Sequence, residues 1–228
     1  MINRIIKNFE RPSKESVERF LTLAVANIDD CMERVGALDS AIKPIGYREP
    51  IVGTAFTVKV APGDNLFLHA AMDLAIPGDI IVIDAGGYRE RAIFGELMAN
   101  YMKIRGVRGI ICDGAVRDAE ALKNMENFQV YAKAITPNGP YKNGPGAVNI
   151  PVVCGGKLIY PGDIVVADGD GVVVIRPDEA DNIYRRTKEV EKKEREIMNR
   201  IEQEHTYVRP WVQEILERLD TKIDERSE

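Results

Sequence analysis

The chain has 228 residues, 45% of them hydrophobic, with a formal net charge of -5 and a pI near 5.3. This length and composition are typical of one large folded domain with extensions. Because the chain is acidic and lacks the clustered Lys and Arg residues that neutralise phosphates, we expect no direct nucleic-acid partner. No stretch reaches the roughly 18 apolar residues of a membrane span, and three widely separated cysteines are typical of free thiols in a reducing compartment. We therefore expect a cytoplasmic protein without a membrane partner.

Residues 1–50 are predicted to form an N-terminal helical extension. Apolar side chains recur at helical spacing in two runs after a start at Pro12-Ser13. The first run comprises Val17, Phe20, Leu21 and Ala24, and the second comprises Ile28, Cys31, Met32 and Val35. Helices with this spacing present one apolar face, so both are expected to pack against the rest of the chain.

Residues 51–176 are predicted to form an α/β core that contains a βαβ unit. A β-rich run over 51–61 precedes a turn and a helix from Asn65 to about Ala75. The apolar runs over 80–84 and 107–113 then predict two buried strands, with a helix over about 92–104 between them. Because a right-handed crossover makes such strands parallel, the loops that follow them are expected at one sheet edge, where ligands favour binding.

The second half of the core alternates short strands and turns, followed by a helical extension over 177–228. Strands are predicted over 129–135, 147–154, 164–168 and 172–175. Residues 77–84 resemble 161–168, which we interpret as one kind of turn used twice rather than a duplication. A charged helix from Pro177 to about Glu204 and an amphipathic helix over 211–219 follow, and their apolar faces either pack on the core or form a subunit interface.

Candidate chemistry gathers where two predicted helices begin. The chain has only two histidines, so carboxylates and arginines must carry the chemistry, and we interpret His69 as a packed helix residue. Gly95 leaves backbone N–H groups open to an anion, and Arg117 offers a planar fork for a carboxylate or a developing oxyanion. Asp118 is a hard oxygen ligand for Mg²⁺, and Glu96 can position or deprotonate a bound water. Taken singly, these residues have simpler roles as helix caps, first-turn acids or surface ion-pair partners.

Three segments in this region resemble the signature of the RraA-like proteins. They are Gly95-Glu96-Leu97-Met98, Arg105-Gly106-Val107-Arg108-Gly109 and Asp113-Gly114-Ala115-Val116-Arg117-Asp118. The resemblance covers roughly residues 24–177, and the family includes class II 4-hydroxy-4-methyl-2-oxoglutarate/4-carboxy-4-hydroxy-2-oxoadipate aldolases and the regulator of ribonuclease activity A. It implies a three-layer β/β/α swivelling-domain-like fold and a homotrimer or homohexamer with active sites between subunits.

The resemblance also implies roles for individual residues. Asp118 is expected to bind a divalent metal, Mg²⁺ or Mn²⁺, Arg117 to contact the substrate carbonyl oxygen, and Glu96, where the family often has Asp, to hold a metal-bound water. Substrate contacts are expected from Gly95, Glu96, Leu97, Met98 and Arg117. Aldolase members tend to carry a further acid where this chain has Ala121 next to Glu120, and a neighbouring chain's C-terminal glutamate completes their site. Glu202 and Glu204 are the candidates for that glutamate.

The resulting functional prediction is a metal-dependent aldolase. It would cleave 4-hydroxy-2-oxo acids of the 4-hydroxy-4-methyl-2-oxoglutarate type to pyruvate, and the same enolate chemistry would permit oxaloacetate decarboxylation. A Schiff-base aldolase is the nearest rival, and Lys59 is its candidate nucleophile, although an outward-facing strand lysine is the simpler interpretation. The competing class is a non-enzymatic regulator that binds a ribonuclease or helicase.

Overall fold

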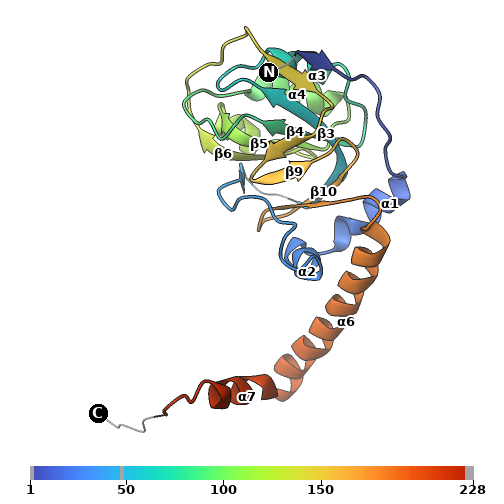
Figure 1. The fold of residues 1–228 in the computed structure, drawn as a ribbon, viewed down its shortest axis with the longest axis vertical. Helices are drawn as coiled ribbons and strands as arrows, with labels where there is room; N and C mark the ends of the chain where they lie inside the picture. The colour runs from blue at the N-terminus through green and yellow to red at the C-terminus, as the bar shows by residue number, and fades with distance from the viewer. Residues whose placement is uncertain (1–2, 47–48, 224–228) are drawn as a thin grey trace. The chain divides into compact units, whose positions relative to one another are not determined.

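The computed structural model describes residues 3–46 and 49–223. Contacts divide the chain into two units, Met1–Lys188 and Glu189–Glu228, and the first holds the α/β fold (Figure 1). The strands are β1 (Arg4–Ile5), β2 (Lys43–Pro44), β3 (Ile51–Val60), β4 (Asp79–Asp84), β5 (Gly109–Val116), β6 (Gln129–Ile135), β7 (Gly146–Val148), β8 (Val152–Cys154), β9 (Lys157–Ile159), β10 (Ile164–Ala167) and β11 (Val172–Ile175). The helices are α1 (Lys14–Glu18), the 3-10 helix η1 (Arg19–Thr22), α2 (Val25–Cys31), α3 (Leu66–Met72), α4 (Glu96–Ile104), α5 (Ala119–Lys123), α6 (Ala180–Glu204) and α7 (Pro210–Arg218).

The main sheet is built around the long strand β3. Its order is β1-β7-β3-β4-β5-β6-β2, and β3 to β6 run parallel to one another. On the other side, β3 pairs antiparallel with β10 along its first half and with β7 along its second half. The carboxyl ends of four neighbouring parallel strands therefore lie at one edge of the sheet, as the βαβ pattern predicts.

Both faces of the main sheet are covered, one by helices and one by strands. Along β4, Ile81 and Ile83 belong to the apolar cluster shared with α3, α4 and α5, while Ile80 and Val82 belong to the cluster shared with β8 and β9. Successive strand residues point to opposite faces, so an uninterrupted apolar run is what a strand buried on both faces requires. Figure 1 shows α3 and α4 on one side of the sheet and β9 on the other. The predicted three-layer β/β/α fold is confirmed.

Some predicted element boundaries are wrong. The strand expected over 147–154 is split into β7 and β8, because Asn149 between them adopts a left-handed φ of 55° that ends the strand. The helix expected from Asn65 starts one residue later, where the Asp64 carboxylate accepts a hydrogen bond from the Leu66 amide at 2.9 Å. The charged helix starts at Ala180 and not at Pro177.

The repeated turn keeps its local chemistry but is used in two different strand pairings. Asp79 and Asp163 are each 1% exposed, and each carboxylate accepts a hydrogen bond from the backbone amide three residues earlier. The glycine before each has a similar positive φ, 93° at Gly78 and 96° at Gly162. The strands that follow lie on opposite sides of β3, one parallel and one antiparallel. This geometry agrees with one turn chemistry used twice.

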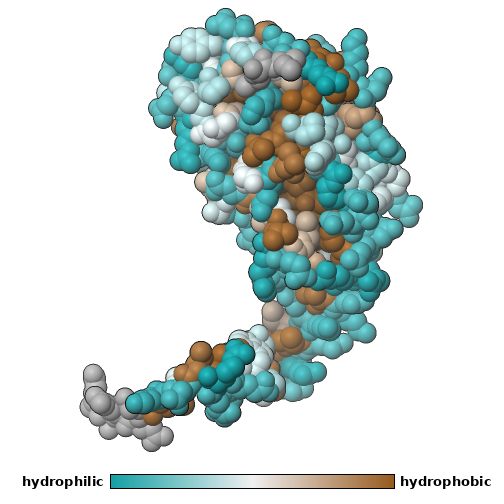
Figure 2. Space-filling view, viewed as in Figure 1, coloured by the Kyte–Doolittle hydropathy of each residue, from teal (hydrophilic) through white to brown (hydrophobic). Residues whose placement is uncertain are grey.

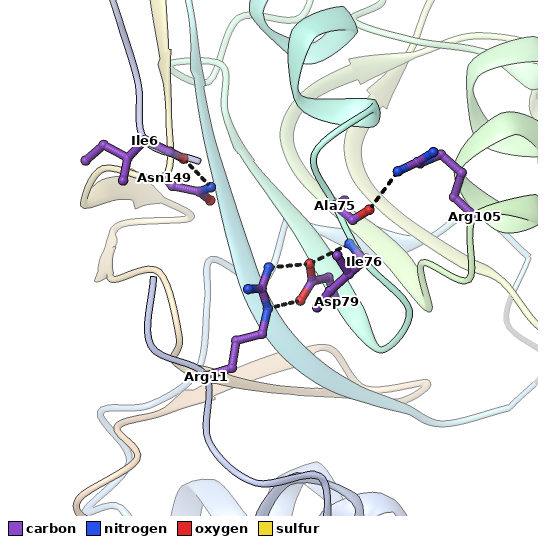
Figure 3. A network of polar contacts seen from close by, with 7 residues as sticks. All are labelled: Ile6, Arg11, Ala75, Ile76, Asp79, Arg105 and Asn149. Atoms are coloured by element: carbon purple, nitrogen blue, oxygen red, sulfur yellow. Dashed lines mark hydrogen bonds and ion pairs between the residues drawn. The ribbon is translucent and has the colours of Figure 1, made fainter. Parts of the chain in front are cut away.

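The N-terminal segment crosses the sheet edge and is fixed to it by polar contacts. β1 pairs in parallel with β7, and the Asn149 side chain donates to the Ile6 carbonyl oxygen at 2.8 Å. Further along, the Arg11 guanidinium donates two hydrogen bonds of 2.9 Å to the Asp79 carboxylate. Figure 3 shows Asp79 held by Arg11 on one side and by the Ile76 amide on the other. A bidentate pair of this kind compensates the desolvation of a buried carboxylate.

Arg11→Met is expected to lower the free energy of unfolding by about 3 kcal/mol, because it leaves the buried Asp79 carboxylate without its cation. Urea unfolding measures this difference. The control is Arg34→Met, which removes the partner of Asp30 in a surface pair whose side chains are 79% and 53% exposed. That change should cost less than about 1 kcal/mol. Equal losses in the two variants would contradict the prediction.

The second unit contains the end of α6 and the helix α7. Within the described residues, the buried side chains of α6 are Ala180, Ile183 and Thr187, near its start, and α7 has none. Trp211 and Leu219 are 56% and 66% exposed. No helix of the described residues is long and apolar enough to cross a membrane. The three cysteines are buried free thiols, as their spacing predicts.

Candidate active site

A short extended segment before α4 brings the predicted site residues together. Residues 92–94 were predicted to be helical, but Ala92 forms a parallel bridge with Ala115 of β5. The Arg117 amide also donates a hydrogen bond to the Phe94 carbonyl oxygen at 3.0 Å. The segment therefore continues beside β5 like a further strand, and the helix begins only after it. The prediction failed here because helical spacing is a local signal, whereas this pairing is made across the crossover.

Gly95 lies directly against the Arg117-Asp118 pair. A methyl group on its Cα would come within 2.8 Å of Arg117 Cγ and would overlap the Asp118 carboxylate. The φ of Gly95 is -148°, which is extended backbone that any residue adopts. Space and not conformation therefore requires glycine at this position, which caps the N-terminus of α4.

Asp118 is held in an unusual backbone conformation at the start of α5. Its φ of 57° and ψ of 42° are left-handed, a region that aspartate tolerates better than most residues. One carboxylate oxygen, Oδ2, accepts a hydrogen bond from the Glu96 amide at 3.0 Å and lies 3.7 Å from Arg117 Nε. The side chains of Arg117 and Asp118 are 44% and 43% exposed. The site on a single chain is therefore an open surface.

The other predicted substrate-contact residues, Glu96, Leu97 and Met98, lie in three different environments. Glu96 is exposed at the first turn of α4, next to Asp118. Leu97 is 84% exposed, and Met98 packs against the core that lies under the helices, where its sulfur is 3.5 Å from the Asn65 side-chain nitrogen. Gly95, Glu96, Arg117 and Asp118 thus come together, while Met98 contributes to the support behind them.

Sequence reasoning missed Arg91 and the loop that follows β6. Arg91 Nη1 donates to the Gly139 carbonyl oxygen at 2.8 Å, and Nη2 donates to the Tyr141 hydroxyl at 2.9 Å. A methyl group on Gly139 would be 3.4 Å from Arg117 Nη1, so this loop also borders the predicted site. Gly139 and Pro140 mark a turn in the sequence, but no local signal indicates that the turn folds back onto Arg117.

A family model described as RraA-like (Aldolase/RraA) matches residues 25–174, which is more than half of the chain. The chain belongs to the RraA-like family. A protein of Halalkalibacterium halodurans named "Putative 4-hydroxy-4-methyl-2-oxoglutarate aldolase" is 41% identical over 172 residues, which are 75% of this chain and 81% of that protein. The name of this relative suggests an aldolase activity for that protein.

Solved RraA-like structures share the fold. A Streptomyces coelicolor member of the RNase ES inhibitor RraA protein family is 27% identical, with a TM-score of 0.76, covering 84% of this chain and all of the other. The RNA-processing inhibitor RraA of Thermus thermophilus is 28% identical, with a TM-score of 0.60, covering 67% of this chain and 92% of the other. The structural relatives therefore include proteins named as regulators.

The donor set of this RraA-like site fits a hard divalent ion that keeps part of its water. Asp118 Oδ1 and the Glu96 carboxylate make no hydrogen bond to other described residues. Over residues 3–46 and 49–223 no group of three or more His, Cys, Asp or Glu side chains could hold a metal. Carboxylate oxygen with few protein ligands suits Mg²⁺, whose shell is usually completed by water and substrate. Asp118, assisted by Glu96, would hold such an ion.

Lys59 has a different environment from the outward-facing position first expected. Its ammonium forms an ion pair with the Asp84 carboxylate, which is 3% exposed, while the Lys59 side chain is 29% exposed. A carboxylate partner stabilises the protonated ammonium, which is not a nucleophile. Nearby, burial raises the pKa of the Cys112 thiol to about 12, so this cysteine is neutral at physiological pH.

Asp113 fixes the turn that leads from β4 toward Arg91. Its carboxylate accepts a hydrogen bond from the Ala85 amide at 2.6 Å. Burial raises the pKa of this carboxyl group, the backbone hydrogen bond opposes the shift, and the neighbouring Asp84 charge adds to it. Asp113 therefore carries a charge that the folded state disfavours.

Asp113→Asn is expected to change the pH dependence of stability. Because the pKa is higher in the folded protein, the folded state binds more protons, and the wild-type loses stability as pH rises through the window between the unfolded and folded pKa values. The neutral amide removes that loss, so the variant should gain stability relative to the wild-type as pH rises above the ordinary carboxyl pKa of 3.8. Urea unfolding across this range measures the difference, with the exposed Glu126→Gln as control. A difference that does not vary with pH would contradict the prediction.

Proposed function

We propose that this chain is a lyase that cleaves the C3–C4 bond of 4-hydroxy-2-oxo acids and releases pyruvate. The observation that carries the proposal is the meeting of Gly95, Arg117 and Asp118 at one point of the sheet edge. A guanidinium and a carboxylate beside the N-terminus of α4 together suit a substrate that presents a carboxylate next to a carbonyl group. The putative-aldolase name of the Halalkalibacterium halodurans relative supports the same chemistry.

In this mechanism Arg117 donates hydrogen bonds to the 2-oxo oxygen and stabilises the negative charge that develops on it. Glu96 holds a water through which it accepts the proton of the 4-hydroxyl group. As that proton leaves, C4 becomes a carbonyl carbon, and the electrons of the broken C3–C4 bond form the pyruvate enolate. Glu96 returns the proton through the same water to C3, which gives pyruvate. The same stabilised enolate would form when oxaloacetate loses carbon dioxide.

Metal removal tests the proposal directly. A divalent ion held by Asp118 would supply Lewis acidity to the carboxylate and 2-oxo oxygens of the substrate. We expect pyruvate formation from 4-hydroxy-4-methyl-2-oxoglutarate or oxaloacetate with Mg²⁺ or Mn²⁺, its loss with EDTA, and its recovery when the ion is restored. Lactate dehydrogenase with NADH reports the pyruvate formed. Turnover that persists unchanged in EDTA would exclude the metal-dependent form of the lyase.

A Schiff-base mechanism at Lys59 predicts a different result. Borohydride would then reduce an imine between pyruvate and the lysine, leaving a covalent adduct that mass spectrometry locates. The ion pair between Lys59 and Asp84 argues against this. We expect no adduct at Lys59, and an adduct there would replace the metal mechanism by the Schiff-base one.

We also propose that the chain assembles as a homotrimer or homohexamer. Apolar surface gathers on the face of the first unit that carries β9 and β10 (Figure 2). In the paired strands β8 and β9, Val153 and Leu158 are 51% and 55% exposed. Exposed apolar patches of this kind commonly mark contacts between proteins. Light scattering should give three or six times the subunit mass of 25.4 kDa. A monomer at micromolar concentration would contradict the assembly.

A regulator of an RNA-processing ribonuclease is the second candidate function. It is supported by the names of the Streptomyces coelicolor and Thermus thermophilus structures. Such a protein acts by binding, so it has no chemical need for Arg117 and Asp118. Inhibition of a ribonuclease E-type enzyme that survives replacement of both residues, without pyruvate formation by the wild-type, would favour the regulator.

A further inference from the structure

Arg91 is held in one orientation by neutral groups. Its two hydrogen bonds go to the Gly139 carbonyl oxygen and the Tyr141 hydroxyl, and its guanidinium carbon lies 4.1 Å from the centre of the Tyr141 ring. No carboxylate of the described residues forms an ion pair with it. The guanidinium has five N–H donors, so donors remain for an external group. Within residues 3–46 and 49–223, Arg91 is therefore a positioned cation without an anionic partner.

Arg91 and Arg117 lie on either side of the same loop residue. Arg91 Nη1 is 2.8 Å from the Gly139 carbonyl oxygen, and Arg117 Nη1 is 3.4 Å from the position of a methyl group on Gly139. With standard backbone dimensions, the two guanidinium groups are no more than about 10 Å apart. Two cations within this distance of each other suit a small molecule with anionic groups at both ends.

We propose that Arg91 is a specificity-determining residue that binds the second carboxylate of a dicarboxylic 2-oxo acid, while Arg117 binds its reacting 2-oxo end; this rests on the proposed lyase function. The terminal carboxyl carbons of a five-carbon chain are about 5 Å apart, and charge-assisted hydrogen bonds add about 2.8 Å at each end. A five-carbon diacid is thus long enough to reach both arginines even at that upper limit. The 4-hydroxy-4-methyl-2-oxoglutarate of the proposed function is such a diacid, and the inference assigns its second carboxylate to Arg91.

The alternative role for Arg91 is to hold the loop that carries Gly139 and Tyr141. In that role its loss would lower turnover of every substrate by a similar factor, because the distorted loop also borders Arg117. In the proposed role its loss would affect diacids selectively and mainly through KM, because the remote carboxylate contact is made in both the ground state and the transition state. The ratio between two substrates separates these cases.

The test compares 4-hydroxy-2-oxoglutarate with 4-hydroxy-2-oxopentanoate, which has a methyl group in place of the second carboxylate. We expect the wild-type to prefer the diacid in kcat/KM, and Arg91→Met to reduce that preference about 10- to 100-fold. Tyr141→Phe, which removes one hydrogen-bond acceptor but keeps the ring, should reduce it less. Arg89→Met, the same change two residues away at an exposed arginine, should keep it. A wild-type without the preference, or an Arg91→Met variant that retains it, would overturn the proposal.

Binding distinguishes failure of this inference from failure of the lyase proposal. Calorimetry compares the Kd of 2-oxoglutarate with that of 2-oxopentanoate, which again differ only in the terminal carboxylate. If neither aldol is cleaved but 2-oxoglutarate binds more tightly and Arg91→Met abolishes that difference, the role of Arg91 is supported and the lyase proposal fails. Equal affinity for the two acids in the wild-type would overturn the role of Arg91, whatever the turnover.

Discussion

Asp118→Asn is expected to lower kcat/KM for pyruvate formation by about 1,000-fold or more without unfolding the protein. Asparagine tolerates the left-handed φ of 57° at this position almost as well as aspartate does. Its side-chain oxygen can still accept the hydrogen bond from the Glu96 amide. The substitution therefore removes the negative charge that would bind a divalent ion and preserves the local geometry. Alanine at position 118 would add backbone strain of about 1–2 kcal/mol, so the effect of the lost charge could not be separated from the effect of the strain.

Arg117→Ala is the companion variant that separates the two roles. Loss of a donor to the developing oxyanion should lower kcat about 100- to 1,000-fold. Calorimetric Mn²⁺ affinity should fall in Asp118→Asn and be kept in Arg117→Ala. Asp170→Asn, the same chemical change at an exposed position, should match the wild-type in both measurements. Wild-type turnover in the Asp118 and Arg117 variants would refute the assignment of the site.

The buried strands could be predicted because their signals are local. Residues 80–83 form an uninterrupted apolar run between a Pro-Gly-Asp turn and the Ala-Gly-Gly break that follows Asp84, and they lie within β4. Handedness of the crossover then places the loops after β4 and β5 at the same edge. This argument was sufficient to predict that Glu96 and the Arg117-Asp118 pair come together, and the Glu96 amide is 3.0 Å from the Asp118 carboxylate.

The details that complete the site could not be predicted because they depend on contacts between distant residues. The extended segment before α4 is stabilised by its bridge from Ala92 to Ala115, although its own sequence continues the helical spacing. Arg91 similarly has partners 48 and 50 residues further along the chain. Amino-acid patterns report the intrinsic preference of a segment, and tertiary pairing overrides that preference when it satisfies buried backbone groups.

The position of the N-terminal segment also could not be predicted from local sequence. Arg11 is 68 residues from Asp79 in the chain, and the two side chains form a bidentate pair. The local sequence does not distinguish Arg11 from other cations that precede a helix. Only the fold shows that the turn before β4 buries a carboxylate which needs that cation. The cost of leaving the Asp79 charge buried without a partner thus favours this position of the N-terminal segment. That cost cannot be inferred from the sequence alone, because it arises only when the turn before β4 has formed.

Gly95→Ala is expected to lower kcat/KM about 100-fold while the protein stays folded. The new methyl group would overlap the Asp118 carboxylate and crowd Arg117 Cγ, so both catalytic side chains must move. A displacement of about 1 Å at a reacting centre costs roughly this factor. Alanine is acceptable at this φ of -148°, so backbone strain does not contribute. Steady-state kinetics and a thermal unfolding curve measure the two parts of the prediction.

Gly139→Ala provides the matched comparison, because it adds the same methyl group near the other end of the Arg117 side chain. There the nearest atom is Arg117 Nη1 at 3.4 Å, the end of a flexible side chain that can give way. The loss of activity should therefore be much smaller than in Gly95→Ala. If Gly95→Ala retains full activity, the close contact of residue 95 with Asp118 and Arg117 is not needed for catalysis. The carboxylate of the substrate must then be bound elsewhere. If kcat/KM falls equally in the two variants, displacement of Arg117 alone explains the loss of activity. The result would then give no support for a role of Asp118.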